Sequence, residues 1–243
     1  MRCYTSAMNG QEGSDIMQPL IAAAHELKAP LALVRQLALT LEDTSLSGAE
    51  RQRLRDQIIL TSERALRLTG DLTKTARLQD AMFQLEPINP EQMCREVVGE
   101  LGPLFEAYGR KVTFKGRRHP LLLVANRDLL RRILLNFSDN ALHYSEPGTA
   151  VHLQVQALRG SGMIRVGVRD YGPALSSDMW RTLQEKLGAA PQPVHARPES
   201  SGLGLYISGQ FADAMQGTIG AVRHRDGATF YVELPASRQL NLL

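Results

Sequence analysis

The first residues with a chemical pattern are a histidine and a glutamate side by side, His25 and Glu26, followed by Pro30. They lie in a run, 16–41, whose apolar residues recur every three or four positions, as on one face of a helix. Pro30 has no N–H to donate to the carbonyl of Glu26, so we expect the helix to loosen there and expose the imidazole. An imidazole beside a carboxylate base can attack an electrophile, and the pair favours phosphoryl capture. Isolated pairs of this kind are more often solvated surface residues, so the rest of the chain decides.

Two asparagines, Asn136 and Asn140, stand four residues apart in a predicted helix over 127–144, which places their amides on one face. Neutral oxygens on one face suit a hard cation such as Mg²⁺, which keeps several waters and takes further oxygens from phosphates. The pair alone is not specific, because two asparagines on a solvated helix face are common.

Two glycine-containing turns could surround a nucleotide. Asp170 and Gly172 follow a predicted strand. The carboxylate could accept a hydrogen bond from an exocyclic amine, and the glycine would let a planar ring come close. Gly202, Leu203 and Gly204 lead directly into a predicted helix, and backbone N–H groups at a helix N-terminus favour phosphates. Each turn alone also fits an ordinary loop.

The elements that must position these residues follow from periodicity and from turn residues. Helices are predicted at 14–41, from a capping box at Ser47 and Glu50 to about 82, and at 90–108, 127–144 and 202–215. Strands are predicted at 111–114, 121–124, 151–158, 164–169, 218–224 and 228–234, with a hairpin turn at 159–162. The segment 171–201, which contains four prolines, is predicted to be irregular.

These elements predict an α+β fold. An N-terminal two-helix hairpin (14–84) follows a disordered lead-in (1–13), and a short linker (85–90) joins it to an α/β sandwich with a mixed, mostly antiparallel sheet (91–238) and a tail (239–243). Two helices with one apolar stripe each cannot cover both stripes, so we expect a homodimer whose hairpins form a four-helix bundle. The alternative is that the stripes pack on the second domain.

Composition limits the classes of function. The 243 residues are 43% hydrophobic, and their net charge of +3 is too weak an imbalance to argue for nucleic acid. Cys3 and Cys94 are far apart and show no ligand spacing, which favours a reduced, cytoplasmic setting. Apolar runs stay well short of the roughly 20 residues that a membrane helix needs, and we expect no membrane segment.

The order of the four clusters carries more information than any one of them. HELKAPL at 25–31, NFSDNALHYS from 136, DYGPA from 170 and SSGLGL from 200 occur once each, in the order of the H, N and two glycine boxes of sensor histidine kinases. Over roughly 14–238 the chain resembles the transmitter core of a two-component histidine kinase. That core is a dimerisation and histidine-phosphotransfer hairpin followed by a Bergerat-type ATP-binding domain.

The resemblance implies a reaction and its partners. His25 would be the phosphoacceptor and Glu26 its catalytic partner, with ATP as phosphoryl donor. Asn136 and Asn140 would hold Mg²⁺. The phosphohistidine would pass its phosphoryl group to an aspartate of a separate response regulator, and a separate protein would supply the sensory input.

The resemblance also implies how the nucleotide is held. Tyr144 would lie against the base, Asp170 would read the adenine amine, and Gly172 would admit the edge of the ring. Gly202 and Gly204, with Leu203 between them, would face the phosphates.

Several positions depart from the family pattern. Ala174 and Ser200 stand where glycines are usual, and His143 where lysine is usual, and the aromatic motif common between the glycine boxes is absent. These changes predict altered lid closure and weakened nucleotide binding. Ala29 stands where many members carry a threonine or asparagine that positions water, so phosphatase activity is not expected.

Other functions remain open. Related ATPases carry a water-activating glutamate where this chain has Asn136, which favours a kinase over an ATPase. The main alternative is a catalytically degenerate phosphotransfer or scaffold protein that docks response regulators without using ATP. A protein-serine kinase of the anti-sigma type would share the ATP-binding domain but has no need of a histidine hairpin.

Overall fold

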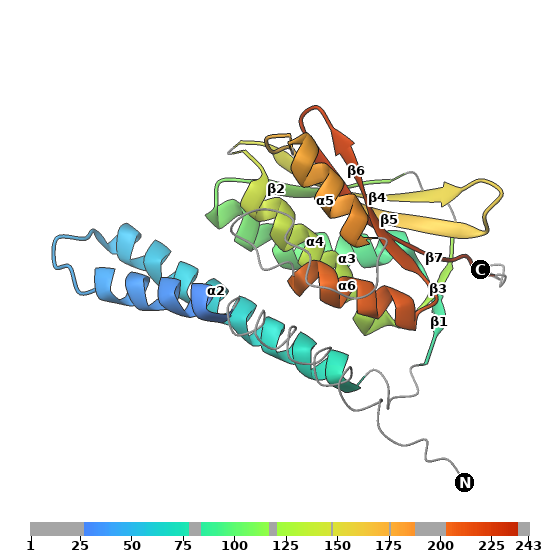
Figure 1. The fold of residues 1–243 in the computed structure, drawn as a ribbon. Coiled ribbons are helices and arrows are strands. Elements are labelled where there is room, and N and C mark those ends of the chain that lie inside the picture. Colours follow the sequence, from blue (N-terminus) through green and yellow to red (C-terminus); the bar gives the residue numbers. More distant parts are fainter. Residues whose placement is uncertain are drawn as a thin grey trace, which may run out of the picture.

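The computed structural model describes residues 27–77, 84–116, 121–146, 148–174, 176–187 and 203–237. Within them a helical hairpin extends to one side of an α/β sandwich (Figure 1). Residues 27–40 are helical, and the second helix of the hairpin is α2, Gly48–Arg77. The other residues predicted for this hairpin, 14–26 and 78–83, lie outside the described parts.

The predicted capping box opens α2. The backbone N–H of Ser47 donates to Glu50 Oε2 at 2.8 Å, and the backbone N–H of Glu50 donates to Ser47 Oγ at 3.3 Å. These reciprocal bonds satisfy donors that the first turn of a helix leaves open. The hydrogen bonds from Ser47 also lower the pKa of Glu50 below its ordinary value. The start of α2 is therefore fixed by local sequence.

The sandwich contains a five-stranded sheet in the order β2-β4-β5-β7-β6. Its strands are β2 (Lys111–Lys115), β4 (Ala150–Leu158), β5 (Met163–Arg169), β6 (Thr218–His224) and β7 (Gly227–Pro235). Only the β2–β4 pair is parallel, and the other three neighbouring pairs are antiparallel. This confirms the prediction of a mixed, mostly antiparallel sheet.

Helices α3 (Pro90–Ala107), α4 (Arg127–Tyr144) and α6 (Leu203–Ala214) cover one face of this sheet (Figure 1). Asn89 caps α3 and Asn126 caps α4, each accepting backbone N–H bonds from the first turn of its helix. Burial alternates along the first part of β5 and the last part of β7, which places one side chain in two there against the helices, whereas the remaining residues of both strands are buried.

Two elements differ from the predicted outline. The segment 171–201 was predicted to be irregular, which is wrong, because α5 (Ser177–Leu187) lies within it and packs beside β6. Leu183 of α5 is fully buried and Trp180 packs partly against the core. The predicted linker contains β1 (Glu86–Ile88), which pairs antiparallel with β3 (Leu123–Ala125) in a separate two-stranded sheet.

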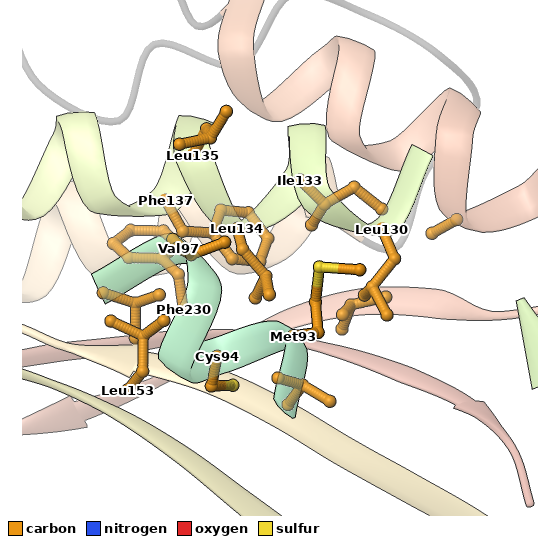
Figure 2. Close-up of a cluster of buried hydrophobic side chains, with 14 of the residues drawn as sticks. Met93, Cys94, Val97, Leu130, Ile133, Leu134, Leu135, Phe137, Leu153 and Phe230 are labelled. Atoms are coloured by element: carbon orange, nitrogen blue, oxygen red, sulfur yellow. The ribbon is translucent and has the colours of Figure 1, made fainter. Parts of the chain in front are cut away.

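The core lies between the helices and the sheet. Figure 2 shows side chains of α3, α4, β4 and β7 meeting there, among them Met93, Phe137, Leu153 and Phe230. The rings of Phe137 and Phe230 are 6.1 Å apart at their centroids, a favourable aromatic separation. Leu135, also buried, lies on the other side of α4 in this view, so α4 is covered on more than one side. Core packing on more than one side fixes the position of α4 and of the polar residues on its remaining face.

Candidate functional site

The predicted amide pair lies on the partly exposed side of α4. Asn136, Asn140 and Tyr144 follow one another at intervals of four and are all half-buried, whereas the interleaved Phe137 and Ala141 are buried in the core. Because residues four apart share a face, the packing of Phe137 and Ala141 aims the polar row toward one edge of the sandwich. The direction of the row is thus set first by the packing of these core residues.

Asn136 connects this row to the start of α6. Its Nδ2 donates to the carbonyl of Gly204 and to Ser208 Oγ, each at 3.4 Å. Ser208 Oγ in turn donates to the carbonyl of Gly204 at 2.7 Å. With its nitrogen used on α6, the amide of Asn136 directs its oxygen away from these acceptors. The contact brings the amide pair beside a helix N-terminus, where open backbone N–H groups favour anions.

Asp170 directly follows β5 and is buried, with 2% of its surface exposed. Its Oδ1 accepts hydrogen bonds from the backbone N–H of Gly172 at 3.2 Å and of Ala228 at 3.1 Å. The backbone N–H of Asp170 donates to the carbonyl of Ala228 at 3.0 Å. Two donors on one oxygen fix the plane of the carboxylate, as an acceptor of defined direction requires.

Gly172 lets the turn after β5 approach the end of α4. A Cβ at this position would overlap the carbonyl oxygen of Tyr144, so only glycine permits the contact. The backbone N–H of Glu146 donates to the carbonyl of Tyr171 at 3.2 Å, which holds the two segments together. Tyr144 and Asp170 are therefore neighbours across this junction.

Arg110 holds the end of α4 from a third direction. Its Nε and Nη2 donate to the carbonyl of Ser145 at 3.0 and 2.7 Å. The carbonyls of a last helical turn have no partners within the helix, and a guanidinium satisfies them well. No local pattern predicts this contact, because Arg110 and Ser145 are 35 residues apart in the chain.

The structure thus describes seven of the predicted site residues and places them on the same three segments. Asn136 contacts Gly204, Gly172 contacts Tyr144, and Asp170 bonds Gly172. Asn140 lies between Asn136 and Tyr144 on α4. Leu203 begins α6. His25, Glu26 and Gly202 lie outside the described residues.

Arg169 and Asp226 are site neighbours that sequence reasoning missed. Arg169 Nη2 pairs with Asp226 Oδ1 at 2.5 Å, and its guanidinium lies over the Tyr171 ring at 4.2 Å. The only sequence signal is that Arg169 and Tyr171 flank Asp170, because Asp226 is 57 residues further along the chain.

Two histidines, His152 and His224, lie near Arg169, and in both the environment disfavours the charged form of the ring. Burial, then Lys115 and Arg169, lower the pKa of His152 below its ordinary value. Burial and Arg169 lower the pKa of His224, although Asp226 and Asp170 act in the opposite direction. Both rings accept or donate locally, His152 with Thr113 at 2.7 Å and His224 with Thr229 at 2.9 Å.

The donor set fits a hard cation held mainly by a nucleotide. Among the described residues no group of three or more His, Cys, Asp or Glu could hold a metal ion. The amide oxygens of Asn136 and Asn140 are neutral and few, which suits Mg²⁺ that takes its other ligands from phosphates and water. His143 and Ala174, two of the departures from the family pattern, are both exposed near this edge.

The sandwich segment matches a known family of ATP-binding domains. Residues 125–238 match the family described as histidine kinase-, DNA gyrase B-, and HSP90-like ATPase. That segment includes the amide row, the turn after β5 and the start of α6. It therefore supports ATP binding by this part of the chain.

Curated relatives extend the match beyond that segment. The sensor protein SphS of Synechococcus elongatus is 30% identical over 229 residues, which cover 89% of this chain and 54% of SphS. The sensor histidine kinase AruS of Pseudomonas aeruginosa is 29% identical over 230 residues, covering 88% of this chain and 22% of AruS. The chain thus spans about half the length of SphS and less of AruS.

Solved structures of histidine kinases have the same fold as this chain. Full-length ShkA, crystallised with AMPPNP, aligns with a TM-score of 0.61 and 27% identity over 93% of this chain and 48% of ShkA. The Acinetobacter baumannii histidine kinase AdeS aligns with a TM-score of 0.56 at 16% identity, over 87% of this chain and 97% of that one, and supports the fold alone. Within the described parts of the chain, no helix is long and apolar enough to cross a membrane.

Proposed function

Since the chain carries the transmitter core of the sensor histidine kinases, we propose that it is a protein histidine kinase that phosphorylates itself on His25. The observation that carries the proposal is the convergence of three segments on one edge of the sandwich. Asn136 bonds Gly204 at the start of α6, and the Asp170 turn meets Tyr144 at the end of α4. A nucleotide between these segments would meet an oriented carboxylate, an aromatic ring and open helix N–H groups.

The reaction is an in-line transfer of the γ-phosphoryl group of ATP. Nε2 of His25 forms the new P–N bond while the bond from the γ-phosphorus to its bridging oxygen breaks, and ADP leaves with that electron pair. Glu26 accepts the proton that the imidazole carried, so the product ring is neutral. The phosphoryl group then passes to an aspartate carboxylate of a response regulator, and His25 regains its proton.

The residues of the sandwich bind and orient the nucleotide. Asp170 accepts a hydrogen bond from the adenine amine, and Tyr144 packs on the base. The backbone N–H groups at Gly202 to Gly204 face the phosphates at the N-terminus of α6. The amide oxygens of Asn136 and Asn140 would hold Mg²⁺, which when bound would neutralise charge on the transferring phosphoryl group.

A second copy of the chain is the proposed partner of the hairpin. Leu31, Ile59 and Leu66 are 59%, 55% and 72% exposed, and Leu33 and Leu39 of the first helix are also exposed. An apolar surface of this kind on two long helices is best covered by another hairpin, giving a four-helix bundle. We further propose a cytoplasmic protein that receives its input from a separate protein.

The experiment is incubation of the purified chain with Mg²⁺ and γ-labelled ATP, beside a His25→Gln variant. We expect label on wild type that resists alkali and is lost in acid, as phosphohistidine is. Label should fall to background in His25→Gln. A His152→Gln variant is the matched control, because His152 lies on β4, away from the hairpin, and it should keep its label.

The outcomes separate the two candidate functions. Alkali-stable label that survives in His25→Gln would contradict the assignment of His25. A folded wild-type chain that takes up no label and binds no ATP would favour the scaffold that docks response regulators without ATP. Binding without label would leave a nucleotide-binding protein that lacks the kinase reaction.

A further inference from the structure

We propose that Arg169 is a positioning residue for nucleotide recognition, which acts by tying the β6–β7 turn to the strand that ends at Asp170. The inference rests on the proposed function, because it concerns how the adenine-reading carboxylate is held. Neither Arg169 nor Asp226 belongs to the motifs that identified the site. Arg169 directly precedes Asp170 in the chain, whereas Asp226 lies beside it because β5 and β7 are neighbours in the sheet (Figure 1).

The guanidinium of Arg169 contacts three acceptors at the junction. Nη2 pairs with Asp226 Oδ1 at 2.5 Å, and Nη1 donates to the carbonyl of Asp226 at 3.3 Å and to the carbonyl of Asp170. The Tyr171 ring covers its other side. The side chain of Arg169 is only 11% exposed, whereas that of Asp226 is 66% exposed. A buried guanidinium with several acceptors holds the exposed turn in place.

The turn held by Arg169 supplies a donor to Asp170. Asp226 immediately precedes Gly227 and Ala228, and the backbone N–H of Ala228 donates to Asp170 Oδ1 at 3.1 Å. Gly227 has a φ of +127°, and a Cβ there would overlap Arg169 and Asp170. The turn is thus packed directly on the two residues that it serves. Movement of the turn would carry the Ala228 N–H away from the carboxylate.

Orienting the Asp170 carboxylate should affect the choice between nucleotide bases more than the overall affinity for nucleotides. With Oδ1 held by two backbone donors, the direction of the second oxygen is set, and it can accept from an exocyclic amine. Hypoxanthine carries a carbonyl where adenine carries that amine, so an oriented carboxylate should reject it. A carboxylate that can rotate would lose this discrimination while phosphate contacts at α6 remain.

Arg165 provides a matched control on the same strand. Its guanidinium pairs with Glu233 at 2.5 Å and lies over the Tyr231 ring at 3.9 Å, so it makes the same two kinds of contact with β7. It lies four residues before Arg169 on β5, and its partners contact neither Asp170 nor the β6–β7 turn. Loss of either arginine removes one cation, one ion pair and one ring contact, although the Arg165 side chain is more exposed, at 26% against 11% for Arg169.

The test is calorimetric titration of the full 243-residue chain with ADP and with IDP, for wild type, Arg169→Met, Asp226→Asn and Arg165→Met. Wild type should prefer ADP by about tenfold or more. Arg169→Met should bind ADP about tenfold more weakly and IDP nearly as before, so that the preference is lost. Asp226→Asn should move in the same direction by a smaller factor, and Arg165→Met should keep the wild-type ratio.

The ratio of the two affinities decides the result. If Arg169→Met retains the ADP preference, or if Arg165→Met loses it equally, the positioning role of Arg169 is overturned and the proposed function stands. If wild type binds neither nucleotide, both proposals are overturned. Should Arg169→Met fail to fold, Asp226→Asn, which keeps the buried arginine, decides the matter by the same ratio.

Discussion

The hairpin and the sandwich differ in how much of their apolar surface each covers within one chain. In the sandwich, Phe105, Phe137 and Phe211 are fully buried. In the hairpin, Leu31, Ile59 and Leu66 are more than half exposed. Three helices on a sheet close a core, whereas two helices with one stripe each leave a surface open. The sandwich covers its own core, and we expect the hairpin to cover its surface with a second copy.

The same contrast separates two kinds of site. The predicted nucleotide residues stand on elements fixed by a closed core, and their geometry exists in a single chain. The predicted phosphoacceptor His25 belongs to the predicted hairpin, whose apolar surface we expect a second copy to cover. Assembly of the hairpin is therefore expected to control His25 chemistry without altering nucleotide binding.

Breaking the hairpin surface should have the largest effect. In Leu66→Asp a charge replaces an exposed leucine that we expect to be buried in the dimer, and burying an unpaired charge is costly. The dimer dissociation constant should rise by about a hundredfold, or about 3 kcal/mol. Sedimentation equilibrium measures it directly.

Val222→Asp is the control for this prediction. Val222 is also an exposed apolar residue, at 37%, but it lies on β6 of the sandwich. It should leave the dimer unchanged. Equal dissociation in both variants, or none in Leu66→Asp, would mean that the hairpin surface is not the dimer interface.

Substitutions at two glycines of the sandwich should have the next largest effects and separate stability from nucleotide binding. Gly172→Ala would force a methyl group against the carbonyl of Tyr144, and we expect a loss of about 1–3 kcal/mol in the free energy of unfolding together with weaker ADP binding. Among the described residues, no atom lies within 4 Å of a Cβ added at Gly204, so Gly204→Ala should keep wild-type stability. If Gly204 faces the phosphates, its alanine variant should nevertheless bind ADP about tenfold more weakly.

Urea denaturation and ADP titration of the two variants separate fold from binding. Gly99→Ala, in the middle of α3 with open space around it, is the control and should gain about 0.5–1 kcal/mol of stability. Unchanged ADP binding in Gly204→Ala would remove Gly204 from the proposed phosphate site. Unchanged stability in Gly172→Ala would mean that the Tyr144 junction is looser than described.

The sequence predicted elements with clear local signals and missed those whose partners are distant. The capping box of α2 and the bounds 127–144 of α4 are confirmed, because caps and helical periodicity are local properties. The strands were placed to within two residues because alternation marks their faces. The pairing of β1 with β3 was not foreseen, because its partners are 35 or more residues apart.

Two omissions have different physical reasons. In α5, prolines further along the segment outweighed a usable signal: Trp180, Leu183 and Leu187 recur at intervals of three and four. For Arg169 the local sequence did not show its role, because that role depends on the ion pair with Asp226, which only the sheet topology brings near. Motifs thus pointed to the predicted nucleotide-reading residues, and the contacts that orient those residues required the structure.

The smallest expected effect is a pH dependence confined to the sandwich. His152 and His224 both have pKa values lowered by burial and by Arg169, and residues 27–77 of the hairpin contain no histidine. Below about pH 6.5 the unfolded chain therefore binds more protons than the folded chain, so stability falls as pH falls through that value and is full above it.

Thermal unfolding at about pH 7.5 and about pH 5.5 measures this dependence, since most carboxylates titrate below that range. We expect a small fall in Tm of wild type at the lower pH, and a smaller fall in His152→Gln/His224→Gln, which keeps His25. An equal fall in both proteins would assign the pH dependence to groups other than these two. A rise in Tm on acidification of wild type would contradict the lowered pKa values themselves, because it requires a folded state that binds protons more tightly than the unfolded chain.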